Sequence, residues 1–241
     1  MALGINCDMG ESFGLYRMGD DSAIMPYITI ANVACGFHAS DPSVMARTVK
    51  LAKKHRVKVG AHPSLPDLQG FGRREMKMEP DELVDCIIYQ VGALKGFLNR
   101  EGMPLNHIKP HGALYGMAAR SEEVARAVAK AAAVFEVPLY GMAGTLHEKI
   151  YEAAGIPFVS EFYTDLAYAK DGSLIITREH EAVEPKAAAK RALRAVKEGK
   201  VKSVDGLDVT VRADCVCVHS DTPGAVEVAK AVRETLASYL E

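Results

Sequence analysis

The sequence predicts an α/β fold: a single, irregular (β/α) barrel over residues 1–241 with about seven parallel strands. Three observations lead to this prediction. Seven short apolar runs alternate with stretches of helical periodicity, and no linker or shift in composition divides the chain. Polar side chains follow at least six of the runs. A barrel gathers such loops at one mouth, whereas an open sheet places its site at a single switch point.

The predicted strands and helices follow from local signals. The apolar runs span residues 3–7, 28–34, 57–60, 106–109, 138–142, 157–161 and 214–219. Helices are expected to begin at or close to Pro42, Pro80, Ser121, Pro185 and Pro223. Serine and aspartate satisfy the free amides of a first helical turn, and proline is pre-organised for that turn.

Composition and charge exclude several classes of partner. Of the residues, 49% are hydrophobic and 25% charged, as in an ordinary globular protein. A formal net charge of −2 argues against nucleic acid or an anionic membrane as the main partner. No apolar stretch approaches the roughly 18 residues of a membrane helix, and no signal peptide is recognisable. Five cysteines without framework spacing fit reduced thiols, so we expect a cytoplasmic protein, and a homo-oligomer stays open.

Four of the eight histidines lie where a predicted strand ends. His38, His62 and His111 occupy short segments rich in Gly, Pro and Asp, and His219 ends the last apolar run. Each one alone is as compatible with a structural role as with a catalytic one. Their recurrence at equivalent strand ends favours a common site.

Four carboxylates lie in the same loops. Asp8 and Glu11 stand three residues apart in a glycine-bounded loop that is expected to follow the first strand. Such a pair could bind a metal or perform acid–base chemistry, or simply cap backbone amides. Asp165 and Asp221 follow the sixth and seventh runs.

Two cations complete the set of candidate residues. Arg73 lies in the glycine-rich segment 69–74, and Lys109 precedes Pro110-His111. Either could bind a carboxylate or phosphate, although a solvated basic turn is the alternative for Arg73. The sequence has no Walker A, G-x-G-x-x-G or H-E-x-x-H motif, which excludes the commonest nucleotide-binding and zinc-protease interpretations.

Six segments resemble those of the LamB/YcsF family. They are residues 6–14 (NCDMGESFG), 31–39 (ANVACGFHA), 60–64 (GAHPS), 70–74 (GFGRR), 109–115 (KPHGALY) and 218–223 (VHSDTP), in consistent order along the chain. The resemblance implies a (β/α) barrel related to the glycoside hydrolase and deacetylase barrels. It also implies ATP-dependent opening of the 5-oxoproline lactam to glutamate, with ATP as co-substrate and with subunits B and C as partners.

The candidate residues receive provisional roles. For catalysis we expect Asp8 with His38 or His62 to activate water or transfer protons, and His111 to polarise or protonate the lactam. Asp8, His38 and His62 are also the candidates for holding a divalent metal. Substrate or phosphate binding is expected from Glu11, Arg73, Lys109, Asp165, His219 and Asp221. All should converge on one pocket of ordinary ligand size at the carboxyl ends of the strands.

The chain departs from the family pattern at several positions. Gly4 stands where the family usually has an aspartate, Leu166 where it has an arginine, and Thr177 where it has a proline. Two other functions therefore stay open. One is a stand-alone, metal-dependent deacetylase or amidohydrolase, and the other is a binding subunit without its own turnover.

Overall fold

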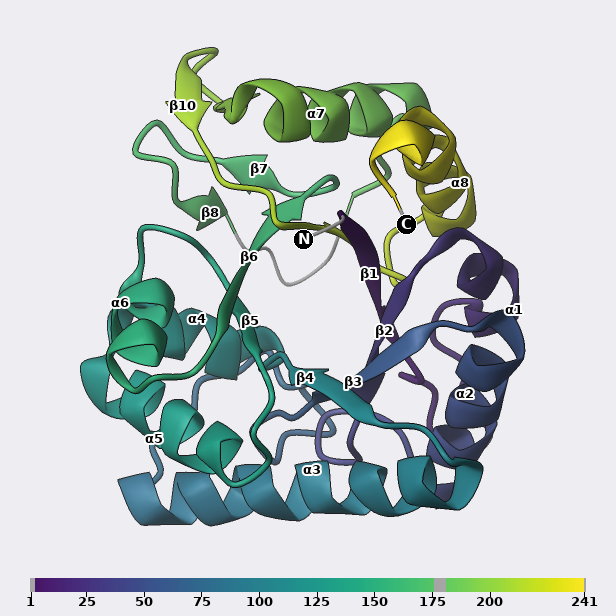
Figure 1. Ribbon diagram of the computed structural model, residues 1–241, viewed down its shortest axis with the longest axis vertical. Coiled ribbons are helices and arrows are strands. Elements are labelled where there is room, and N and C mark those ends of the chain that lie inside the picture. The colour runs from purple at the N-terminus through teal and green to yellow at the C-terminus, as the bar shows by residue number, and fades with distance from the viewer. Residues whose placement is uncertain (1–2, 176–180, 241) are drawn as a thin grey trace.

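Seven parallel strands close into a barrel in the computed structural model, which describes residues 3–175 and 181–240 (Figure 1). Around the barrel their order is β1, β11, β6, β5, β4, β3, β2. Their bounds are β1 Gly4–Met9, β2 Ile30–Ala34, β3 Lys58–His62, β4 Leu105–Ile108, β5 Leu139–Gly141, β6 Phe158–Tyr163 and β11 Cys215–Val218. The predicted barrel of seven parallel strands is confirmed. The departure at Thr177 lies outside the described residues.

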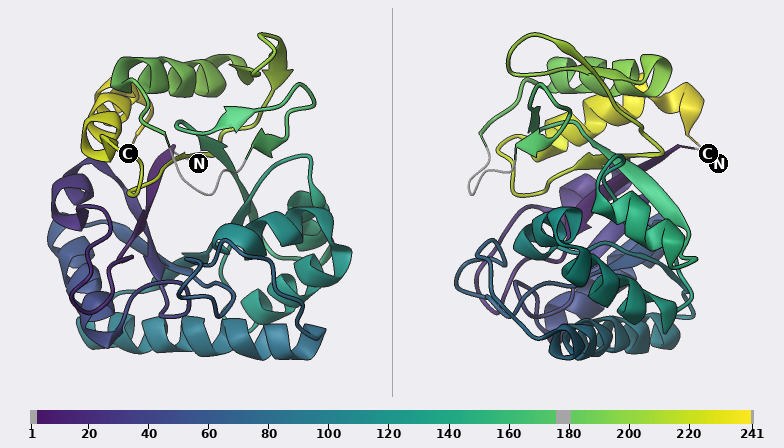
Figure 2. Two further views of the ribbon diagram at one scale, coloured as in Figure 1. Left: turned by 180° about the vertical axis from the view of Figure 1, so that it is seen from behind. Right: turned by 90° about the vertical axis from the view of Figure 1, so that its left-hand side faces the viewer.

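Helices surround the barrel on its outer side (Figures 1 and 2). They are α1 Asp21–Ile24, α2 Pro42–His55, α3 Pro80–Glu101, α4 Gly112–Arg120, α5 Glu122–Ala133, α6 Leu146–Ala153, α7 Pro185–Glu198 and α8 Ala225–Thr235, with short 3-10 turns at Met25–Tyr27 and Ala237–Tyr239. Four helices begin where their start signals predict, and the last begins two residues after Pro223. The sequence did not predict α4 or α6, each of which is too short for a clear helical period.

Two antiparallel hairpins lie outside the barrel between β6 and β11 (Figure 1). One pairs β7 Ala167–Tyr168 with β8 Leu174–Ile175, and the other pairs β9 Lys200–Lys202 with β10 Asp208–Thr210. These strands of two or three residues carry no detectable alternation, which is why the sequence did not predict them. Leu3 pairs with Leu240, so the two ends of the described chain lie side by side.

The main hydrophobic core lies between the barrel strands and the helices. Helix α3 buries Leu83, Ile87, Val91, Leu94 and Leu98 along one face, at spacings of three and four residues. Full burial of one such side chain contributes roughly 1.5–3 kcal/mol. A separate small cluster is formed by four inward-facing side chains, Ile30, Tyr140, Val159 and Cys215, at the amino-terminal end of the barrel.

Above this cluster the barrel interior becomes polar. Asn6, Asn32 and His107 are fully buried and face one another, because side chains two apart on a strand point to the same side. The His107 Nε2 donates to the Asn32 amide oxygen at 2.7 Å, and the Asn32 amide donates to Asn6 Oδ1 at 2.8 Å. A Cβ at Gly60 would overlap the His107 ring, so glycine is required beside it. This neutral layer supports the mouth of the barrel directly above.

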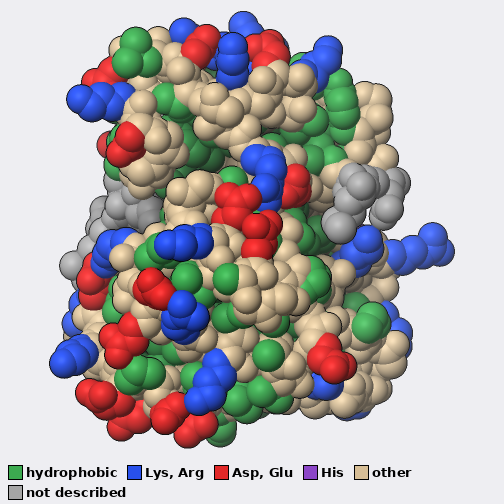
Figure 3. Space-filling view, turned by 60° about the vertical axis from the view of Figure 1, so that its left-hand side comes forward, with side chains coloured by type: hydrophobic (Ala, Val, Ile, Leu, Met, Phe, Trp, Pro, Cys, Tyr) green, Lys and Arg blue, Asp and Glu red, His purple; other side chains and the backbone are tan. Residues whose placement is uncertain are grey.

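The outer surface mixes both signs of charge. On the face of Figure 3, acidic and basic side chains are interspersed with apolar ones. Across residues 3–175 and 181–240, no helix combines the length and apolar character needed to cross a membrane.

Candidate active site

Most of the predicted site residues meet in one cavity at the carboxyl ends of the strands. Its lining includes Asp8, Glu11, His62, Arg73, Lys109, His111, His219 and Asp221. His38 and Asp165 are buried immediately behind this lining, where His38 contacts Glu11 and Asp165 contacts His219. The cavity volume is only about 50 Å³, so the expectation of an ordinary ligand pocket was wrong. Tyr115, Tyr163 and Leu166 close in around it.

Asp8 lies within a strand and not in a loop as predicted, because β1 continues to Met9. Its carboxylate accepts a hydrogen bond from the Asn32 amide at 2.7 Å and pairs with Lys109 Nζ at 3.0 Å. The second oxygen, Oδ2, is 3.3 Å from His62 Nε2. Burial alone would raise the pKa of Asp8, but His62 and Lys109 outweigh it and hold that pKa well below its usual range. Asp8 is therefore a buried, charged carboxylate.

Lys109 is the buried cation of the site. Its Nζ is 3.3 Å from Glu161 Oε1 and donates to Cys217 Sγ at 3.2 Å, in addition to its ion pair with Asp8. Burial lowers the pKa of Lys109, but Asp8, Cys217 and Glu161 outweigh this and raise it well above the ordinary value. Lys109 is thus held between two acids, so an incoming anion would have to share it with them.

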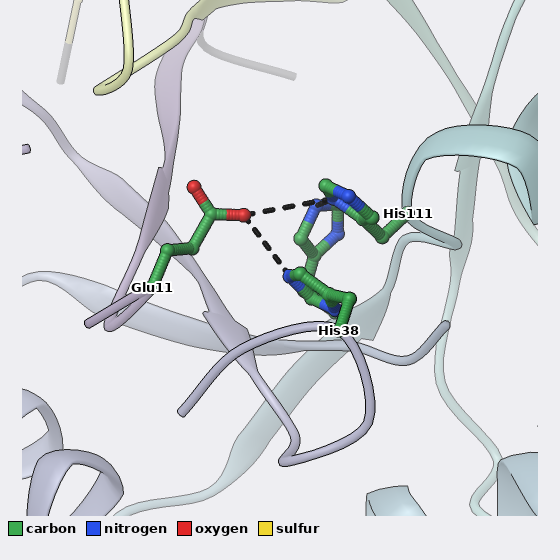
Figure 4. Close-up of side chains that lie close together, drawn as sticks. Glu11, His38 and His111 are labelled. Carbon is green, nitrogen blue, oxygen red and sulfur yellow. Dashed lines mark hydrogen bonds and ion pairs between the residues drawn. The ribbon is translucent and has the colours of Figure 1, made fainter. Parts of the chain in front are cut away.

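Glu11 contacts two histidines that stack on each other (Figure 4). Its Oε1 lies 3.0 Å from His38 Nε2 and 3.6 Å from His111 Nδ1. The two rings are nearly parallel, with centroids 3.7 Å apart. Burial lowers the pKa of both histidines well below normal, and burial together with Asp8 raises the pKa of Glu11. The structure therefore pairs His38 with Glu11 and leaves His62 as the imidazole beside Asp8.

One group among the described residues has the composition and spacing of a metal site. Glu11, His38, His62 and His111 each offer one ligand atom, and these atoms lie within 4.8 Å of one another. Asp8, a predicted metal candidate, lies beside this group and is engaged by Lys109. Imidazole nitrogen with carboxylate oxygen is a common donor set for zinc and related ions.

A second pair of contacts occupies the opposite side of the mouth. His219 Nδ1 is 3.0 Å from Asp165, and the backbone amide of His219 donates to the same carboxylate at 2.9 Å. Burial lowers the pKa of His219, but Asp165 outweighs it and leaves that pKa raised. At the rim, Arg73 pairs with Asp221 at 2.6 Å and lies over the Phe71 ring. Among the ion pairs of the mouth, the side chains nearest to solvent are those of Arg73, His219 and Asp221, which are 13%, 11% and 10% exposed.

Sequence reasoning missed several residues of this network. Asn32, Glu161 and Cys217 contact predicted site residues, and His107 contacts Asn32, but none of the four was predicted. A signal was present, since polar residues two apart in Asn6 and Asp8, or in His107 and Lys109, share one face of a strand. Such alternation marks the interior face of a barrel.

The departures from the family pattern fall at two different ends of the barrel. Leu166 lines the cavity, and its carbonyl oxygen accepts a hydrogen bond from Arg191 at 2.5 Å. Gly4 lies at the amino-terminal end, where an added Cβ would press on the tip of Ile30. Gly4, where the family usually has an aspartate, therefore lies away from the mouth, whereas Leu166 lines it.

A larger cavity of about 560 Å³ adjoins the mouth. Leu174 lines both cavities, and Glu161, Tyr168 and Arg212 line the larger one. The ion pair between Glu161 and Lys109 thus lies between the two spaces.

The fold and the site together define a (β/α)-barrel protein with buried histidines and carboxylates at its mouth. The LamB/YcsF family model matches residues 3–239. The chain belongs to the LamB/YcsF family, as the sequence resemblance predicted.

Named relatives match nearly the whole chain. The A subunit of 5-oxoprolinase from Bacillus licheniformis is 48% identical over 236 residues, covering 96% of this chain and 93% of the relative. Lactam utilization protein lamB from Emericella nidulans is 47% identical over 239 residues, covering 98% and 94%. The crystal structure of the lactam utilization protein from Thermus thermophilus is 47% identical, with a TM-score of 0.92 and coverage of 99% and 97%.

Proposed function

We propose that this chain is the A subunit of an ATP-dependent 5-oxoprolinase, which opens the lactam of 5-oxo-L-proline to L-glutamate. The observation that carries the proposal is the near full-length match, at 48% identity, to a protein named as the A subunit of 5-oxoprolinase. The buried acid and imidazole groups at the barrel mouth support it, because ring opening needs groups that move protons.

ATP is the proposed co-substrate, because a five-membered lactam is a stabilised amide. Transfer of a phosphoryl group from ATP to the carbonyl oxygen would make the lactam carbon open to attack by water. The ring C–N bond then breaks and phosphate leaves, so that glutamate, ADP and phosphate are the products. Each step needs an oriented water and a proton for the departing nitrogen.

We assign the water to Asp8 together with His62. The Asp8 Oδ2 lies 3.3 Å from His62 Nε2, and Asn32 with Lys109 fixes the orientation of the carboxylate. A charged carboxylate held beside an imidazole can orient water and share its proton. His111 is proposed to relay a proton to the lactam nitrogen, which its Nδ1 would first receive from His62 Nε2, 2.9 Å away.

Arg73 is the proposed contact for the substrate carboxylate or for phosphate. It lies at the rim of the cavity and its guanidinium is already oriented by Asp221 and Phe71. Planar guanidinium groups bind carboxylates in a fixed geometry. A cavity of about 50 Å³ is too small for the lactam, so substrate entry requires the side chains around Leu166 and Leu174 to move.

Subunits B and C are the proposed partners, since several relatives are named as one lettered subunit of 5-oxoprolinase. A turn beside the mouth supports contact with another protein. Leu15 and Tyr16 are 96% and 79% exposed there, although Gly14 and Met18 fix the turn through hydrogen bonds to Asp41 and Ser12. Rigid, exposed apolar side chains are typical of an interface. We also propose a cytoplasmic location, which the five free cysteines support.

The test is 5-oxoproline-dependent ATP hydrolysis by the purified chain, with and without subunits B and C. We expect glutamate and ADP in equal amounts only from the complete mixture. Glutamate formation by the complete mixture without ATP consumption would contradict the proposal.

A second function is favoured by the group Glu11, His38, His62 and His111. Such a group suits a stand-alone, metal-dependent deacetylase or amidohydrolase. That function predicts hydrolysis of N-acetylated or cyclic amides by the isolated chain with a divalent metal and without ATP. A third alternative, a binding subunit without turnover, predicts 5-oxoproline binding by the chain and full activity of the partners without it.

A further inference from the structure

We propose that Glu11, His38, His62 and His111 form a binding site for a first-row divalent transition metal ion, with Zn²⁺ as the probe. The inference goes beyond the lactam reaction and does not depend on it. It rests on the spacing of the four ligand atoms, on the ring nitrogens that face the cavity and on the contacts that hold them.

The hydrogen of His62 is fixed by a backbone carbonyl. Its Nδ1 lies 2.7 Å from the carbonyl oxygen of Lys109, which can only accept. Nδ1 therefore carries a hydrogen, and Nε2 is the ring nitrogen directed at the cavity, toward Asp8 and His111. This is the arrangement of most metal-binding histidines, whose second nitrogen donates to a carbonyl or carboxylate.

His111 is held through its other ring nitrogen. Its Nε2 lies 2.8 Å from the carbonyl oxygen of Phe71 and so carries a hydrogen. Its Nδ1 then faces His62 Nε2, 2.9 Å away. A cation shared between these two nitrogens, either a proton or a metal ion, satisfies both. Glu11 and His38 beside the pair supply the further donors that a metal ion needs and a proton does not.

Glu11 and His38 complete the donor set. Glu11 Oε1 lies 3.6 Å from His111 Nδ1 and 3.0 Å from His38 Nε2, and Figure 4 shows its carboxylate directed at both rings. Two ligands at the usual metal distances of a tetrahedral ion lie about 3.4 Å apart. The two spacings of Glu11 bracket this value and all four atoms lie within 4.8 Å of one another, so side-chain shifts would bring them into coordination.

The surroundings hold the group in place. The four residues are 1–4% exposed and come from the loops after β1, β2 and β4 and from the end of β3. Gly72, with φ of +64°, lies against the group, where an added Cβ would press on His38 and His111. A site formed by four separate strand ends is pre-organised, which is a requirement for tight metal binding. Asp8 adjoins the group through His62 and would remain the proton acceptor for a ligand of the ion.

The first experiment is a titration of metal-stripped protein with Zn²⁺, monitored by calorimetry. The second is the visible absorption spectrum of the Co²⁺ form. We expect one ion per chain and the spectrum of a four-coordinate nitrogen–oxygen site. Glu11→Gln keeps the shape of the side chain but removes its charge. It should weaken binding by more than the roughly 10–100-fold that is typical of losing a supporting hydrogen bond. His62→Ala should do the same.

His55→Gln is the matched control, because this histidine lies at the end of α2, away from the mouth. It should bind Zn²⁺ as the parent chain does. Glu11→Gln that stays folded and binds Zn²⁺ with unchanged affinity would overturn the proposal, as would a parent chain that binds no ion. In the latter case His62 and His111 share a proton, which the nitrogen chemical shifts of the two rings would reveal.

Discussion

The barrel interior holds two neighbouring polar groups of residues that differ in charge. The lower one, Asn6, Asn32 and His107, is neutral, and burial followed by Lys109 and His62 lowers the pKa of His107 to about 3. The upper one contains Asp8 and Lys109, which are both charged and both buried. Asn32 joins the two through a 2.7 Å hydrogen bond from its amide to Asp8.

The difference indicates which group has a structural role. Neutral amides and an imidazole satisfy one another's hydrogen bonds without a counterion. Burial of the lower group therefore costs little free energy, provided that the side chains are precisely packed. Buried charges lose their hydration, and pairing them only compensates for that loss. A fold has no need of them for stability alone. Strongly shifted pKa values at the mouth of a barrel are therefore better explained by function.

Removal of the buried cation should have the largest effect on stability. Lys109→Met leaves Asp8 and Glu161 without their shared partner, so the free energy of unfolding should fall by about 3–5 kcal/mol. Denaturant unfolding followed by circular dichroism measures this. Lys50→Met, at an exposed position of α2, is the control and should change stability by less than about 0.5 kcal/mol. If Lys109→Met and Lys50→Met lowered the free energy of unfolding equally, the ion pairs of Lys109 would make no special contribution to stability.

Overpacking of the neutral group should come next. Gly60→Ala places a methyl group into the His107 ring, and we expect a loss of about 1–3 kcal/mol. Combination with His107→Ala should recover part of it, because the overlap is then gone. Gly92→Ala in α3 meets no neighbouring atom and should instead stabilise the helix by roughly 0.5–1 kcal/mol. If Gly60→Ala stabilises the protein as Gly92→Ala is expected to, His107 does not lie as close to Gly60 as the structure places it.

The smallest effect on folding is expected at the rim. Arg73→Ala should raise the KM for 5-oxoproline about tenfold, as loss of one charged hydrogen bond implies, while the melting temperature falls little. Arg74→Ala removes the neighbouring guanidinium, which pairs with Asp67, and should leave KM unchanged. A lower melting temperature with an unchanged KM for Arg73→Ala would make Arg73 a structural tie to Asp221.

The strands, and the convergence of the site residues at the mouth of the barrel, could be predicted because both depend on local signals. Apolar runs located all seven barrel strands, and the position of His62 and His111 at strand ends located the mouth. The side-chain pairings could not be predicted. Whether Asp8 meets His38 or His62 depends on the alternation within β1 and on the stagger of neighbouring strands, which no single segment encodes.

The size of the cavity and the two outer hairpins could not be predicted from the sequence either. The mouth is narrow because bulky side chains, among them Tyr163 and Leu166, line it. The strands Ala167–Tyr168 and Leu174–Ile175 are too short to show a period. The sequence predicts a loop at Asp8 because polar residues commonly mark the end of a strand, whereas in a barrel they also line the interior.

Asp8 is the residue whose charge the proposed catalysis requires most directly. Asp8→Asn preserves the shape of the side chain and removes its charge, and Asp85→Asn makes the same change at an exposed position of α3. The measurement is glutamate production from 5-oxoproline and ATP by each variant reconstituted with subunits B and C, with circular dichroism confirming the fold. We predict that Asp8→Asn lowers turnover by about 10²–10⁴-fold while Asp85→Asn matches the parent chain. A folded Asp8→Asn chain with parental turnover would contradict the assignment of the charged group to catalysis.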